Sequence, residues 1–217
     1  MALFLKYFSR VLLLLLVIPV TNCARGLAAK WMGDDTAEQE GRITLNPLVH
    51  LDPIGALAML LIGFGWGRQL PINPARMNDP RKGIIVTSLA GPVSHFLFAY
   101  LGIIAMNIMR ATLNLSGVTP AAAVYIILQI VTNINICLGV INILPIPPMD
   151  GFQVLNQLAG ANFHRWYYSN YRIINQASTV IILLLFMLPN EISPLVWLIT
   201  WVQRLLFAAG RWVFYLF

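Results

Sequence analysis

Long uncharged stretches alternate with short polar segments along most of this 217-residue chain. A transmembrane helix needs about 20 mostly apolar residues to cross the hydrocarbon core of a bilayer. The runs that approach or exceed this length, or that reach it with their flanks, are residues 11–20, 84–108, 120–149, 173–189 and 192–203. The pattern therefore predicts an all-α polytopic membrane protein with five to six transmembrane helices, the first of them from Leu3 to Trp31.

A polar and glycine-containing region separates the first of these runs from the second. Residues 41–51 alternate apolar and polar positions around Ile43 and Leu45, which predicts a short strand or an extended loop. Residues 54–67 are apolar but few, and Gly63, Gly65 and Gly67 follow one another at their end. We expect them to form a re-entrant or interfacial segment, because irregular backbone survives at membrane depth only where other protein covers it.

Aromatic side chains gather in residues 151–172, where they predict an amphipathic segment at the membrane interface. Two further apolar helices are expected after it, at residues 173–189 and 193–215. We therefore divide the chain into a membrane core at 1–155, followed at 156–217 by an interfacial segment and two C-terminal transmembrane helices.

Composition supports a membrane protein and excludes other classes. Hydrophobic residues make up 59% of the chain and charged residues only 10%, where soluble domains carry about 25% charged residues. The net charge of +6 is typical of loops that lie against anionic lipid. Because no Lys/Arg cluster is present, we expect membrane lipids as partners and no nucleic acid. Cys23 and Cys137 both lie in apolar surroundings, which argues against a disulfide framework.

Four separated motifs follow one another in the same order and spacing as in a known family. They are GDDTAEQEGRITLNPLVHLDPIG from Gly33, GFGWGRQLPINP from Gly63, NDPRKGIIVTSLAGPVSH from Asn78 and NINICLGVINILPIPPMDG from Asn133. Together they resemble the short bacterial form of the site-2 proteases, the M50-type intramembrane zinc metalloproteases. The resemblance covers about residues 20–155 and implies a multi-pass protein of the bacterial inner (cytoplasmic) membrane.

The resemblance also implies where a metal site would lie. In that family two histidines of an H-E-x-x-H helix and the aspartate of an N-x-x-P-x-x-P-x-D-G segment hold zinc, and the glutamate is the general base. Histidines at i and i+4 share one helical face, and a third ligand leaves the fourth position for water. The metal lowers the pKa of that water toward about 7, and the glutamate takes its proton.

This sequence departs from the family pattern on one side of that site. The H-E-x-x-H positions, counted back from Gly33, are Thr21, Asn22, Cys23, Ala24 and Arg25. Threonine and asparagine are poor zinc ligands, asparagine is no general base near neutral pH, and arginine stays protonated. The third helix carries His95 where the family has asparagine.

The other side of the site keeps the family pattern. The retained residues are Asn142, Pro145, Pro148, Asp150 and Gly151. We predict no catalytic residue and no bound metal at the degenerate positions. The predicted pocket consists of Arg25, His95, Asn142, Pro145, Asp150 and Gly151.

Asp150 then needs a new partner, because a carboxylate inside a membrane protein is costly unless it is paired. The guanidinium of Arg25 can replace the metal as its counter-charge. Alternatively, Arg25 extends toward the lipid headgroups. In a third possibility, zinc binds a rewired site made from His50, His95, Cys23 and Asp150. Positions 21–25 and Asp150 can meet only if residues 54–67 re-enter rather than cross, which places the site on the cytoplasmic side.

The functional prediction follows from the lost ligands. We expect a non-catalytic homologue, a pseudoprotease, that binds another integral membrane protein as an assembly or regulatory subunit, through helix packing or β-augmentation. The alternative is an active intramembrane metalloprotease with altered metal ligands. A transport role is disfavoured, because the ionisable groups expected within the membrane cluster at the former active site.

Overall fold

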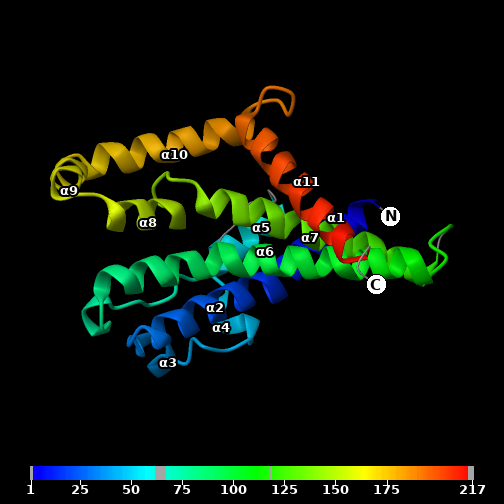
Figure 1. The fold of residues 1–217 in the computed structure, drawn as a ribbon, viewed down its shortest axis with the longest axis horizontal. Coiled ribbons are helices and arrows are strands. Elements are labelled where there is room, and N and C mark those ends of the chain that lie inside the picture. Colours follow the sequence, from blue (N-terminus) through cyan, green and yellow to red (C-terminus); the bar gives the residue numbers. More distant parts are fainter. Residues whose placement is uncertain (1, 62–66, 118, 215–217) are drawn as a thin grey trace.

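The structure is a computed structural model that describes residues 2–61, 67–117 and 119–214, and the regular elements within these residues are all helices (Figure 1). The elements are α1 (Ala2–Leu12), η1 (Leu13–Val17), α2 (Ile18–Trp31), α3 (Thr36–Gln39), α4 (Pro47–His50), α5 (Pro53–Leu61), η2 (Pro74–Arg76), α6 (Pro80–Thr112), α7 (Pro120–Ile143), α8 (Asp150–Leu158), α9 (Ala161–Ser169), α10 (Tyr171–Met187) and α11 (Pro194–Phe214). The prediction of an all-α membrane protein is confirmed.

The first predicted helix is present as one continuous helical segment from α1 to α2, and its middle five residues are π-helical. Pro19 lies in the first turn of α2, two residues after the π-helical stretch Leu13–Val17 ends. Proline has no N–H, and its ring clashes with the carbonyl one turn earlier. A π-bulge widens that turn, so the helix continues through the proline instead of ending there.

Helices α6 and α7 run antiparallel and pack closely, with α2 beside α6 (Figure 1). Two glycines allow the close approach of α6 to α7. A Cβ atom on Gly102 would lie 2.2 Å from Thr132 Oγ1, and one on Gly139 would lie 2.7 Å from the Phe96 ring. Small residues at helix crossings let backbones approach in membrane proteins, where packing rather than the hydrophobic effect drives association.

Three described helices are long and apolar enough to cross a membrane, at Tyr7–Trp31, Pro80–Thr112 and Pro120–Ile143. Helix α10 is apolar but has 17 residues, and α11 has 21 residues with Gln203 and Arg204 in its middle. The expected total of five to six transmembrane helices therefore remains a prediction for these two C-terminal elements.

Of the two alternatives expected for residues 41–51, a short strand or an extended loop, the strand does not form, and residues 42–46 are a loop. Residues 43 and 44 form a bend, and Pro47–His50 is the short helix α4. The side chain of Asn46 accepts a hydrogen bond from Leu48 N, and Pro47 occupies the first helical position, so the local sequence starts a helical turn instead. In the described residues, β pairing is limited to one antiparallel bridge between Leu51 and Gly67.

That bridge also bears on the predicted re-entrant segment. Helix α5 has nine residues, or about 14 Å of rise, too short to cross a hydrocarbon core of about 30 Å. The two ends of the segment meet at the Leu51–Gly67 bridge. The chain therefore returns to the place from which it left, as the re-entrant prediction requires. Residues 62–66 of the predicted segment lie outside the described residues.

Candidate functional site

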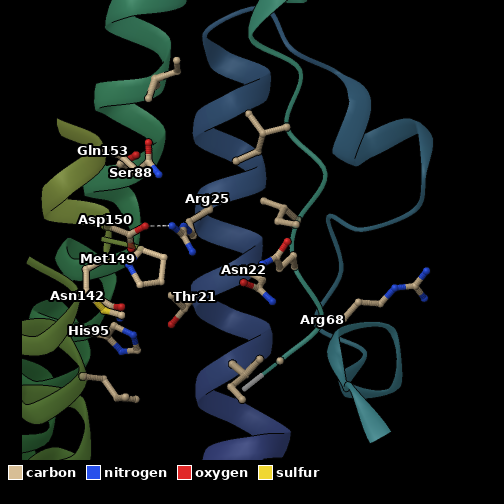
Figure 2. A pocket seen from close by; sticks show the side chains of 18 of the residues that line it. Thr21, Asn22, Arg25, Arg68, Ser88, His95, Asn142, Met149, Asp150 and Gln153 are labelled. Carbon is tan, nitrogen blue, oxygen red and sulfur yellow. Dashed lines mark hydrogen bonds and ion pairs between the residues drawn. The ribbon is translucent and has the colours of Figure 1, made fainter. Parts of the chain in front are cut away.

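A pocket of about 570 Å³ opens between α2, α6 and the start of α8, with the extended segment of residues 67–73 along its other side (Figure 2). Its polar lining comes from elements far apart in the sequence. The polar residues that line it are Thr21, Asn22, Arg25, Arg68, Gln69, Ser88, His95, Asn142, Asp150 and Gln153. The pocket therefore lies where the resemblance places the metal site.

Two of the lining residues, Arg25 and Asp150, form an ion pair. Arg25 Nη2 donates a hydrogen bond to Asp150 Oδ1, and Figure 2 shows the two side chains pointing toward each other across the pocket. The Asp150 side chain is 8% exposed and that of Arg25 is 27% exposed, so the carboxylate is the more deeply buried partner. This is the pairing that replaces the metal in the sequence-based hypothesis, and the guanidinium does not extend away to the headgroups.

Helix α6 packs against the pair at Gly91. A Cβ atom on Gly91 would lie 3.0 Å from Asp150 Oδ2 and 3.5 Å from Arg25 Cδ. The glycine thus leaves room for both charged side chains between α2, α6 and α8.

Asp150 reaches the pocket because α7 ends in a proline-rich connection. Leu144 ends α7 with extended backbone, and after the prolines α8 begins at Asp150, which lies in the first turn with its carboxylate near the positive end of the helix dipole. Gly151 makes the tight return possible. A Cβ atom there would lie 2.0 Å from the Ile143 carbonyl oxygen and 2.8 Å from that of Leu144.

Replacing Gly151 by alanine is expected to destabilise the protein by about 3 kcal/mol or more, because the clash is with backbone and no side chain can move to relieve it. Thermal unfolding in detergent measures the effect. Gly160→Ala is the matched control, because a Cβ atom there meets nothing within 4 Å. This substitution should change the free energy of unfolding by no more than about 0.5 kcal/mol. Equal effects of the two substitutions would contradict the close-approach role of Gly151.

Thr21 and Asn22, which the resemblance places at a histidine position and at the glutamate position, have hydrogen-bond partners other than Asp150. Thr21 Oγ1 donates to the Val17 carbonyl oxygen at 2.9 Å, one turn back along its own helix. The Asn22 amide donates to Nδ1 of His50 at 3.3 Å. In the described contacts, neither side chain forms a hydrogen bond with Asp150.

His50 is buried in the loop beside α2 and holds that loop in place. Its Nε2 donates to the Thr44 carbonyl oxygen at 2.8 Å, which leaves Nδ1 as the acceptor for Asn22. Burial lowers the pKa of His50 and so favours the neutral ring that this arrangement needs. Both ring nitrogens are therefore occupied by protein.

His95 lines the pocket but is tied to α7. Its Nδ1 donates to Asn135 Oδ1 at 3.0 Å, and the Asn135 amide in turn donates to the Val131 carbonyl oxygen at 2.9 Å. Cys23 is a free thiol that does not belong to the described pocket lining. The rewired set of His50, His95, Cys23 and Asp150 is therefore not brought together: in the described part of the chain, no three residues of these ligand types converge on one point.

The pocket differs from its prediction in two further ways. Pro145 is exposed and Gly151 packs on the α7 backbone, so neither belongs to the described lining, whereas Arg25, His95, Asn142 and Asp150 do. Sequence reasoning missed Ser88 on α6, Gln153 on α8 and the segment at residues 67–73. Gln153 could have been found, because position i+3 from Asp150 shares its helical face.

The turn after α2 holds the extended segment beside the pocket. Asp34 is fully buried and accepts hydrogen bonds from Thr36 N, Thr36 Oγ1 and Asn73 N, the last at 2.6 Å. Burial alone would raise the pKa of this carboxyl group, but these hydrogen bonds and the positive charge of Arg76 outweigh it and hold the pKa below its usual value. The ionised carboxylate thus anchors residue 73 against the end of α2.

Comparison with known proteins now identifies the family. The chain is 36% identical over 152 residues to "Putative zinc metalloprotease YwhC" of Bacillus subtilis (strain 168), a match that covers 68% of each chain. This chain belongs to the site-2 protease family, peptidase family M50. Residues 107–186 match the profile of "Peptidase family M50". The chain is also 31% identical over 130 residues to "Putative zinc metalloprotease Rip2" of Mycolicibacterium smegmatis (strain ATCC 700084 / mc(2)155), over 57% of this chain and 46% of that protein. No solved structure gives a significant match.

Family membership together with the apolar helices makes this a multi-pass membrane protein. The names of both relatives imply zinc. The residues of this M50 chain do not fit a zinc site at the family position. A guanidinium already pairs with Asp150, and a divalent cation placed there would meet the positive charge of Arg25. Its three histidines, at positions 50, 95 and 164, form no H-x-x-x-H pair.

Proposed function

We propose that this M50 protein is a non-catalytic member of its family that binds a transmembrane segment of another integral membrane protein, as an assembly or regulatory subunit in the bacterial inner membrane. The observation that carries the proposal is the Arg25–Asp150 pair. The guanidinium of Arg25 is a fixed cation next to Asp150. Unlike a zinc ion, it has no coordination position at which a water molecule could bind and be activated.

The pocket around the pair supports a binding role. It remains open, its lining mixes polar and apolar side chains, and the segment of residues 67–73 contributes Gln69, Leu70 and Ile72. Extended backbone beside a pocket is suited to pairing with an extended peptide, while pocket side chains select among its residues. A partner segment that unwinds near its end can use both features without being cut.

The test is site-specific photo-crosslinking in living cells with the full-length chain. A benzoylphenylalanine at position 153, on the pocket wall, should give one dominant crosslinked membrane protein of unchanged length. The same probe at position 101, an exposed α6 residue outside the described pocket lining, is the matched control and should give only weak, diffuse products. Crosslinking that is equal at both positions would contradict binding in the pocket.

A metal-dependent enzyme would behave differently in a second measurement. Adding the metal chelator 1,10-phenanthroline to the purified chain is expected to leave its thermal midpoint unchanged. A metal bound only to the folded state would stabilise that state, so its removal would lower the midpoint. A clear fall of the midpoint, or crosslinked partners that appear shortened, would argue for the active metalloprotease instead.

A further inference from the structure

Arg204 lies in the middle of α11, a 21-residue helix that the sequence predicts to cross the membrane. Its neighbour Gln203 donates from Nε2 to Asn133 Oδ1 at 3.0 Å. Asn133 is about 20 Å from the start of α7 and about 15 Å from its end, at 1.5 Å per residue. Since α7 is long and apolar enough to cross the bilayer, this contact places residues 203 and 204 near the bilayer centre.

The two faces of α11 differ in what they contact. The inward face packs through Leu195, Ile199 and Val202 against the buried cluster formed with α6 and α7. Arg204 is on the outward face and is exposed, between Trp201 at 60% exposure and Leu205 at 50%. Among the described residues, Arg204 has no hydrogen-bond or ion-pair partner.

An arginine in this position needs a partner from outside the fold. A charged side chain at the bilayer centre is costly, and such residues pair with another charge or face water; snorkelling to the headgroups serves residues near helix ends. A second copy of this chain offers no carboxylate at this depth. Its eight acidic residues all lie outside residues 7–31, 80–112, 120–143, 171–187 and 194–214.

We propose that the outward face of α11 docks a transmembrane helix of a different membrane protein that brings an aspartate or glutamate to Arg204 at mid-membrane. Trp197 and Trp201, one turn apart, form the apolar wall against which that helix packs. The pairing desolvates both charges together and sets the register of the two helices, since a shift by one turn would leave each charge alone in lipid. This surface is separate from the Arg25–Asp150 pocket and stands whether or not that pocket is catalytic.

The test uses the full-length chain and a designed peptide in phosphatidylcholine vesicles. The labelled peptide is a leucine–alanine transmembrane helix with a single central glutamate, and energy transfer to the labelled chain reports association. We expect the central-leucine peptide to bind about tenfold more weakly. Arg204→Leu should abolish the preference for glutamate, whereas Arg211→Leu, which removes an exposed arginine near the end of the same helix, should leave it intact.

A charge exchange keeps the test independent of folding defects. Arg204→Glu should lose the glutamate peptide and gain a peptide with a central lysine. Equal binding of the glutamate and leucine peptides by the unaltered chain would overturn the proposal. So would association of the chain with itself through Arg204 without peptide, or an effect of Arg204→Leu that appears only with anionic lipid. These outcomes leave the crosslinking result at position 153 untouched, so the two proposals fail separately.

Discussion

Arg25→Ala is expected to lower the free energy of unfolding by about 3 kcal/mol, because it leaves the buried carboxylate of Asp150 without a counter-charge. The value lies at the low end for a buried pair, since the Arg25 side chain is partly open to the pocket. For a chain of this length the change corresponds to a thermal midpoint about 6–12 °C lower. Thermal unfolding of the detergent-solubilised chain measures it.

The double substitution Arg25→Ala/Asp150→Asn separates an ion pair from simple loss of packing. Removing both charges should recover most of the stability, because no uncompensated charge remains in the site. Lys30→Ala is the matched control. It breaks the exposed Lys30–Glu38 pair one turn beyond the site and should cost less than about 1 kcal/mol. If the double variant is as unstable as Arg25→Ala alone, the pair does not stabilise the fold.

Restoring the lost ligands is expected to restore metal binding. The triple variant Thr21→His, Asn22→Glu, Arg25→His should bind about one zinc ion per chain, because residues 21 and 25 share the helical face that lines the pocket and Asp150 supplies the third ligand. Residue 25 already contacts Asp150, so no rearrangement of α2 against α8 is required. Elemental analysis of purified chain measures the zinc content.

Two comparisons give this experiment its meaning. The unaltered chain should contain no stoichiometric zinc, and adding Asp150→Asn to the triple variant should abolish binding, since two histidines alone do not make a structural or catalytic zinc site. Zinc in the unaltered chain would contradict the non-catalytic proposal. A triple variant without zinc would show that the two sides of the site do not meet in the geometry that the metal needs.

Most of the architecture follows from the sequence, because membrane helices are specified locally. The uncharged runs predict the helices that become α6 and α7 to within a few residues. The exceptions also have local causes that were overlooked. Asn46 and Pro47 start a helical turn where alternation predicts a strand, and α6 begins earlier than expected because Asp79 caps it and Pro80 fits its first position.

For the candidate site, less can be predicted from the sequence than for the helices. By itself, the sequence predicts that Thr21 and Arg25 stand at the positions of the family's histidine ligands, that Asn22 stands at the position of its glutamate, and that the Asp150 carboxylate is retained, because matching a motif needs no coordinates. Only the tertiary structure decides what Asp150 contacts, since Arg25 is 125 residues away and helix packing alone brings the two together. Packing likewise separates His50 from His95 and turns Arg204 outward, because a residue's partners depend on which helices become neighbours.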